Sequence, residues 1–274
     1  MPSDPATYNV TLTPLQTLLL ASLLELPALP LALTEPPDEP YEQAVNDALD
    51  QLVAQDYAQR PAEDTLTLNA TVVSILQRVA SAPVMLTVSA FAEWKATEAR
   101  FHIAPDLAVM QSQTEEGETV FAALRDADVL RESLTDLAPL PEEEPAGSER
   151  TLTPADIQAA FGLVPDATLQ DGATPAGAQE GEDQLDANMT VARLDLYERA
   201  DASVPGEWRL THRLAWLTSQ DQLWRAVADG SDETLLLVPA SPTEISASWQ
   251  KIVRAATEGY APYTTKARKV ADYA

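Results

Sequence analysis

Hydrophobic residues in the first part of the chain recur at helical spacing, and three helices are predicted there. The first begins at Thr13 and Pro14, which supply an N-cap hydroxyl and a proline at the first helical position, and it runs to about Leu26. Leucines lie on several of its faces, so we expect it to be a buried helix. The second and third predicted helices span residues 41–57 and 69–81.

From residue 84 the apolar positions change to a spacing of two, which is the period of a strand. Turn-rich segments separate the alternating runs, as in an antiparallel meander. The runs are residues 84–91, 99–103, 107–111 and 119–124. Residues 126–137 then return to helical spacing. The first half of the chain therefore predicts helices, a meander and a closing helix, in that order.

The second half of the chain repeats this order. Residues 151–154 copy the Thr-Leu-Thr-Pro of residues 11–14, and a helix is predicted over residues 155–163. Four strand-like runs follow from Met189 onwards, and a final helix begins near Pro242. The return of the meander and its closing helix carries more weight than the four identical residues.

This order predicts an α+β protein made of two quasi-repeats. Each has helices plus an antiparallel β-meander followed by a helix, and the two share a central sheet. The boundaries fall at residues 1–138 and 150–274, joined by an acidic, proline-rich connector at residues 139–149. A mobile loop is expected at residues 164–187, which are rich in Gly, Pro, Ala and acids. One compact domain overall is the open alternative.

The chain of 274 residues carries 43 acidic and 17 basic side chains, a formal charge of −26. Phosphate backbones and anionic membranes are bound largely through Lys and Arg, so neither nucleic acid nor membrane is an expected partner. A high-salt habitat is an alternative reason for the acidity. The absence of cysteine excludes disulfides and thiolate chemistry. No signal sequence or transmembrane segment is recognised, and a cytoplasmic location is expected.

Catalytic chemistry finds little support in the sequence. The two histidines, His102 and His212, both lie in alternating strand patterns and have no nucleophile or metal-ligand spacing beside them. Phosphate-binding, dinucleotide and hydrolase motifs are absent. We therefore expect no enzyme activity, no catalytic residue, no metal and no cofactor. The acidic clusters are interpreted as solvated turns.

The helices before the first strands also fit a winged-helix unit, with residues 41–57 as its second helix. The polar face of that helix carries Glu42, Asp47 and Asp50, which would repel phosphate. A regulatory or scaffolding protein derived from winged-helix units, without a secretion client, is therefore the alternative function.

Trp94 is the tryptophan that fits no strand or helix pattern. It lies in the predicted loop between the first two meander strands, directly before Lys95. A large aromatic residue in such a loop either folds back on the protein or contacts a partner.

The pattern as a whole resembles the EspG family of type VII secretion chaperones. The resemblance rests on the strand, leucine-rich helix and apolar run of residues 9–33, on residues 42–59, on the helix ending at residues 77–83, and on the repeated meander. It implies a quasi-twofold duplicated fold and a non-enzymatic chaperone or adaptor. The chain departs from the family in its acidity and in residues 164–187.

The resemblance also implies a partner. Members of the family grip the helical tip of a secreted client protein with the loop between these strands and with the C-terminal helical region. By this resemblance, Phe91, Trp94 and Lys95 are the candidate partner-binding residues, and the client is expected to be a helical-hairpin protein. The sequence indicates neither the oligomeric state nor the identity of the client.

Overall fold

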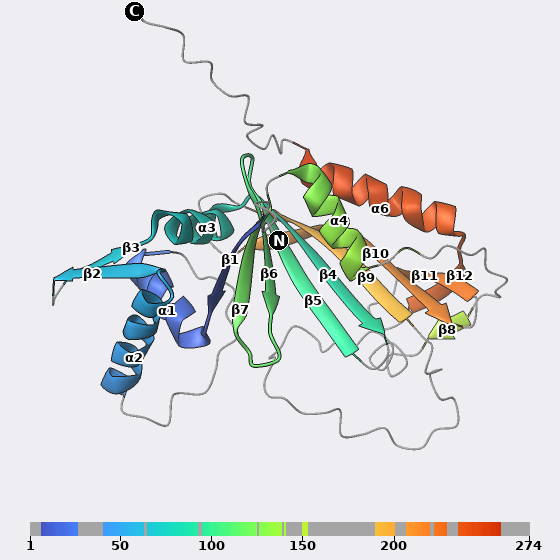
Figure 1. Cartoon of the computed structure of the whole chain (residues 1–274). Helices are drawn as coiled ribbons and strands as arrows, with labels where there is room; N and C mark the ends of the chain where they lie inside the picture. Colours follow the sequence, from blue (N-terminus) through green and yellow to red (C-terminus); the bar gives the residue numbers. More distant parts are fainter. Residues whose placement is uncertain are drawn as a thin grey trace, which may run out of the picture.

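The computed structural model describes residues 7–26, 41–62, 65–92, 95–124, 126–138, 140, 150–152, 190–200, 207–219, 222–228 and 235–258. These residues form a ten-stranded antiparallel sheet, a separate two-stranded hairpin, and helices that pack on the large sheet or beside it (Figure 1). Most of the predicted connector, the predicted loop at residues 164–187 and the predicted helix at residues 155–163 lie outside the described residues.

The large sheet has two halves with the same internal order. In their order across the sheet, its strands are β1 (Thr7–Leu12), β7 (Thr119–Leu124), β6 (Ala108–Gln113), β5 (Lys95–Ile103), β4 (Val84–Ala92), β9 (Thr190–Arg199), β10 (Trp208–Ser219), β11 (Gln222–Ala228), β12 (Leu235–Pro239) and β8 (Arg150–Leu152). Each half has its earliest strand at the outer edge and the four strands of its meander inside. The halves meet at β4 and β9. The predicted α+β class, with repeats that share a sheet, is confirmed.

The predicted helices that fall within the described residues are present, and the starts of four of them follow from local capping. Thr13 and Gln16 form a capping box at the start of α1 (Pro14–Leu23), and Ser241 and Glu244 form another at α6 (Pro242–Thr257). Asn69 caps α3 (Ala70–Ser81), and Asp126 caps α4 (Ala127–Leu137). The remaining described helix is α2 (Tyr41–Ala54).

The prediction that the first helix is buried was wrong in part. Helix α1 ends at Leu23 rather than Leu26, and its Leu18 and Leu23 side chains are 47% and 53% exposed. The stripe that packs on the rest of the protein includes Leu20 and Ala21. Apolar residues around the whole helix do not show which side the neighbouring elements leave open.

A β-hairpin follows α2 that the sequence analysis missed. It consists of β2 (Ala58–Ala62) and β3 (Thr65–Leu68), paired with each other and separate from the large sheet. Four of the five β2 residues are exposed. A strand that is exposed on both faces lacks the alternation of apolar and polar residues by which strands are recognised. Pro61 of β2 also weakens the strand signal, because proline cannot donate to a strand ladder.

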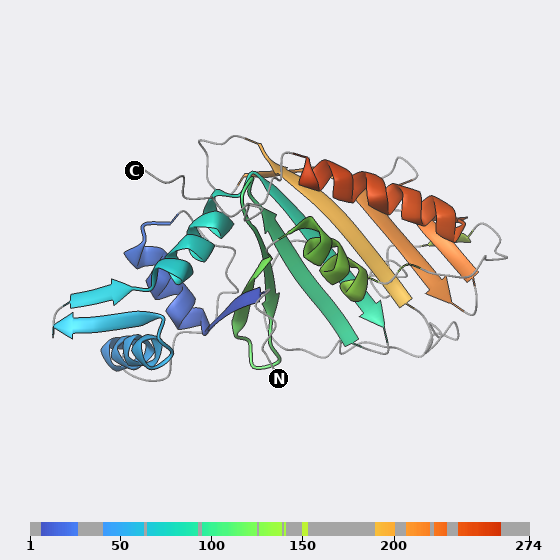
Figure 2. The ribbon, with the colours of Figure 1, turned by 45° about the horizontal axis from the view of Figure 1, so that its top comes forward.

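Two hydrophobic cores lie on opposite faces of the large sheet. Helices α4 and α6 lie side by side over one face, as Figure 2 shows, and pack on residues from both halves, among them Phe101 and Trp216. The other core joins α1, α2 and α3 to the opposite face of β1, β6 and β7, with Leu12 and Phe121 fully or almost fully buried.

Candidate functional site

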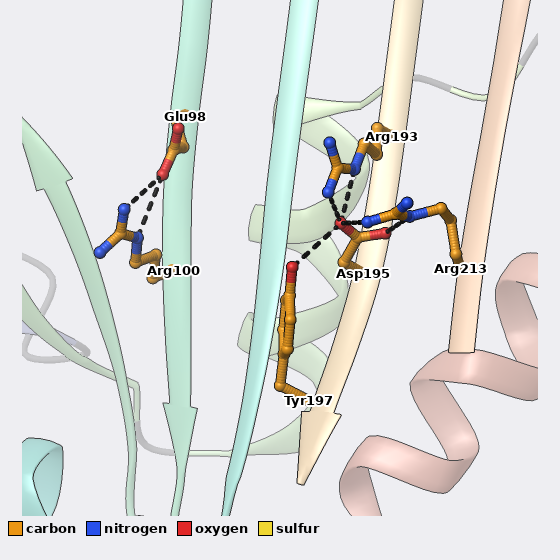
Figure 3. A network of polar contacts seen from close by, with 6 residues as sticks. All are labelled: Glu98, Arg100, Arg193, Asp195, Tyr197 and Arg213. Atoms are coloured by element: carbon orange, nitrogen blue, oxygen red, sulfur yellow. Dashed lines mark hydrogen bonds and ion pairs between the residues drawn. The ribbon is translucent and has the colours of Figure 1, made fainter. Parts of the chain in front are cut away.

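The face opposite α4 and α6 has two parts. Among the described residues, the helices on this face lie over β1, β7 and β6, and α3 reaches β5. The adjoining stretch of this face is made of the side chains of β5, β4, β9 and β10. We call this stretch the central face. It contains the junction of the two halves and a network of polar side chains (Figure 3).

Strand register aligns polar side chains in a row across the central face. Thr87 of β4 pairs with Arg100 of β5 on one side and with Asp195 of β9 on the other. Asp195 in turn pairs with Arg213 of β10. Directly opposed residues on antiparallel strands project from the same face. The row therefore brings together residues from both halves of the chain.

Asp195 is the centre of the network. Its side chain is 2% exposed and accepts hydrogen bonds from two arginines. Arg193 Nε lies 2.5 Å from Oδ2, while Arg213 Nε lies 2.8 Å from Oδ1 and its second nitrogen 3.2 Å from Oδ2. Tyr197 donates its hydroxyl proton to Oδ2 over 3.3 Å. A buried carboxylate needs such partners, since burial without them is costly.

The surroundings of Asp195 also change the pKa values of its neighbours. Burial raises the pKa of Tyr197, and the nearby negative charge of Asp195 raises it further. Partial burial alone lowers the pKa of Arg213, but hydrogen bonds to Asp195 and its charge outweigh this, so the pKa is raised. Both groups keep their protons at neutral pH. One carboxylate therefore lies between two guanidinium groups, which leaves a net positive charge.

A second ion pair lies beside this network on β5. Glu98 Oε1 accepts hydrogen bonds from Arg100 Nε at 3.1 Å and from its terminal nitrogen at 3.0 Å. At the end of β9, Arg199 donates to the carbonyl of Ala80 at 2.6 Å and lies 5.3 Å from the ring centre of Trp208. A chain with a formal charge of −26 thus gathers several of its arginines on this one face.

Two of the three predicted contact residues, Phe91 and Lys95, fall at one end of the central face. Phe91 lies in β4, two residues beyond Ser89, and its backbone pairs with Ala96 and with Val191. Lys95 is the first residue of β5. Trp94 lies outside the described residues. The backbone therefore places two of the three positions beside the network, and their role in binding stays a prediction.

The Asp195 network was missed by the sequence analysis, although the sequence holds a signal for it. Residues 193, 195, 197 and 199 of β9 are Arg, Asp, Tyr and Arg, and the apolar residues Ala192, Leu194 and Leu196 alternate with the first three. A strand at the centre of a large sheet that carries a run of polar groups on one side must satisfy those groups by pairing across strands. The strand was recognised, but its place at the junction was not.

The two histidines have different surroundings. His102 is buried, and its Nε2 lies 2.8 Å from Gln111 Oε1. Burial lowers the pKa of His102 to about 4, helped by the charges of Arg100 and Arg199, so the ring is neutral at pH 7. His212 is half-buried, with Nδ1 3.3 Å from Thr211 Oγ1. Within the described part of the chain, no cluster of three or more His, Asp or Glu side chains could hold a metal ion.

The N-terminal hairpin bears on the winged-helix alternative. The predicted acidic face of α2 is exposed at Glu42, Asp47 and Asp50. Arg60 of β2 lies 3.0 Å from Asp50 in an ion pair. A basic residue that would face phosphate in a winged helix is therefore paired with a carboxylate of its own chain.

The chain was compared with known proteins. No protein-family model matches it, and no characterised protein matches it significantly by sequence. By structure, it is similar to the type VII secretion system chaperone EspG5 of Mycobacterium tuberculosis, solved in complex with a PE25-PPE41 dimer. The TM-score is 0.50 at 9% sequence identity, and the match covers 93% of this chain and 98% of EspG5. The likeness is therefore one of fold, over nearly the whole length of both chains.

The helices were also compared with the dimensions of a lipid bilayer. No described helix has both the length and the apolar character needed to span one.

Proposed function

We propose that this protein is a non-enzymatic chaperone or adaptor of type VII secretion, acting in the cytoplasm. It binds an apolar helical segment of a secreted client protein. The fold carries the proposal: a duplicated sheet whose match to EspG5 spans 93% of the chain. The EspG5 structure contains a PE25-PPE41 dimer, and we infer by analogy that the partner of this chain is also a protein.

The central face supplies the chemistry for such a contact. At one end, Val191 and Leu217 pair across β9 and β10 beside Phe91 of β4, and both are buried. In the middle, the side chain of Arg213 is 48% exposed while its guanidinium is fixed on Asp195. A helix with polar flanks would meet guanidinium donors there.

The test compares the effects of substituting two aromatic residues, Trp94 and Tyr8. The tagged protein is purified from its native cell, captured proteins are identified, and the main one is produced and mixed with the purified chain. We expect an exported helical protein that forms a complex of defined stoichiometry by size-exclusion chromatography. Trp94→Ala should weaken this complex at least about tenfold, as for an aromatic hot spot.

The matched control is Tyr8→Ala, because Tyr8 is an exposed aromatic residue on the distant edge strand β1. Equal affinity of Trp94→Ala and wild-type protein rejects Trp94 as an anchor. Recovery of a regulatory protein that is not exported favours the scaffolding alternative. A co-purifying nucleotide or DNA overturns the proposed function.

A further inference from the structure

A hollow lies on the other side of the sheet, between β10, β11 and α6. Its volume is about 260 Å³. It is lined by His212, Arg213, Leu214, Arg225, Ser248, Lys251 and Ile252. His212 and Leu214 belong to the face that α6 covers, since they pair with Leu196 and Leu194 of the core beneath α6. We call this site the α6 hollow, and it is distinct from the central face.

Two cations from separate elements meet at the α6 hollow. Arg225 comes from β11 and Lys251 from α6, and both are exposed. Neither forms an ion pair with any residue that the structure describes. Glu244 interacts electrostatically with Arg225, but its Oε2 accepts hydrogen bonds from the Ser241 amide at 2.9 Å and hydroxyl at 3.1 Å. The capping box thus holds the Glu244 carboxylate at the helix start.

The third basic residue of the lining, Arg213, is paired with a carboxylate outside the hollow. Arg213 borders the hollow, yet its guanidinium binds Asp195 on the opposite face. The positive charge of the hollow therefore comes from Arg225 and Lys251. Lys251 is the one lysine whose side chain lies within the described structure. Two cations that line one hollow, with no ion pair among the described residues, are unusual on a chain with a formal charge of −26.

Neutral groups complete the hollow. The Ser248 hydroxyl makes no hydrogen bond to any described residue and is free to donate to a ligand. His212 lines the same space and is held by Thr211 through Nδ1. Leu214 and Ile252 are buried and form apolar walls. Charged donors together with a hydroxyl and an apolar wall fit an oxyanion that carries a small organic group.

We propose that the α6 hollow is a binding site for a dianionic phosphate group, either free or as a small monoester. Two cations on different elements match a dianion better than a monocarboxylate, because each cation can form its own charge-assisted hydrogen bond. A volume of about 260 Å³ leaves room for an ester group against Leu214 and Ile252. The proposal is independent of client binding on the central face.

The two histidines of the chain provide the readout. Inorganic phosphate is titrated into the full-length protein at constant ionic strength, with sodium chloride as the balancing salt, and the imidazole signals are followed by NMR. We expect the His212 signal to follow a saturable curve with phosphate and not with chloride. His102, buried against Gln111 away from the hollow, should stay unchanged and serves as the internal reference.

Matched variants locate the site. Lys251→Gln and Arg225→Gln should each weaken phosphate binding about tenfold, the loss of one charge-assisted hydrogen bond. Arg254→Gln removes the same charge from the same helix outside the hollow, so binding should stay within about twofold of wild type. Equal weakening by all three variants, or a His212 signal that does not respond to phosphate, overturns the proposal.

Two further ligands distinguish the source of the phosphate. Phenyl phosphate that binds more tightly than inorganic phosphate supports a monoester, since its ring would contact Leu214 and Ile252. Tighter binding of inorganic phosphate supports the free ion. Acetate that binds as tightly as either one overturns the assignment to a dianion.

Discussion

The two halves of the sheet have the same strand order but different coverings. In the first half, α4 lies on one face and α1 to α3 lie on the other. In the second half, α6 covers one face, and the opposite side continues the central face with the Asp195 network. Among the described residues, helices thus lie on both faces over β6 and β7 of the first half, whereas the second half has a helix on one face and polar groups on the other.

The side chains of the strands reflect this difference in helix coverage. On β6, Ala108 faces the core under α4 and α6, and its neighbour Val109 faces the core under α1 to α3. On β9, Leu194 faces the core under α6, whereas Asp195 faces the central face. A strand covered on both sides is apolar at consecutive positions, and a strand covered on one side alternates. The coverage of each half can therefore be tested by substitution.

The largest effect is expected from a matched pair of leucines. Leu12 of β1 is fully buried in the core under α1 to α3, so Leu12→Ala should lower the free energy of unfolding by about 4 kcal/mol. Leu217 of β10 is 5% exposed and belongs to neither core, so Leu217→Ala should cost about 2 kcal/mol. Urea denaturation measures both. Equal losses would mean that the two halves are covered alike.

The next effect concerns pH and the buried histidine of the first half. An unfolded histidine titrates near 6.5, whereas the folded pKa of His102 is lowered to about 4, chiefly by burial. The unfolded state therefore takes up its proton first. The contribution of His102 to the free energy of unfolding therefore falls by up to about 3 kcal/mol as the pH drops from about 6.5 to about 4.

His102→Gln should remove this contribution, so the difference in stability between wild type and variant should shrink across that pH range. His212→Gln is the control, because His212 is only half-buried. Thermal unfolding at a series of pH values measures both variants. If the difference in stability between wild type and His102→Gln stayed constant from pH 7 to pH 4, this would contradict the burial of His102.

Two carboxylates on the central face give an intermediate effect. Asp195→Asn leaves Arg193 and Arg213 without their shared counter-charge, and we expect a loss of about 2 kcal/mol, moderated because Arg213 is half exposed. Glu98→Gln breaks an exposed pair in the next row and should cost no more than about 0.5 kcal/mol. Equal losses in urea denaturation would show that Asp195 is not the organising group.

The smallest effect tests a feature that the halves share. Thr13 and Ser241 both form capping boxes, at the starts of α1 and α6. Thr13→Ala and Ser241→Ala should each destabilise the protein by about 1 kcal/mol. A loss confined to one of them, measured by thermal unfolding, would show that the two helix starts are not equivalent.

Much of the fold was predictable from the sequence because the signals are local. The caps at Thr13, Asn69 and Asp126 act within three residues, and the strand-like runs of β4 to β7 can each be recognised alone. The hairpin of β2 and β3 was not predicted, because β2 carries no alternation and the alternation of β3 covers only Thr65–Leu68. The candidate contact residues came from a family resemblance, and their backbone positions beside the central face came from strand pairing.

The sequence by itself determined where the helices and strands begin, and that two similar sets of elements follow one another. Tertiary structure decided which sides of those elements are covered, why Leu18 is exposed, and which charges meet. Asp195 and Arg213 are 18 residues apart, and Arg225 and Lys251 belong to different elements. Such contacts depend on register and on packing between distant segments, which local patterns of apolar and polar residues do not encode.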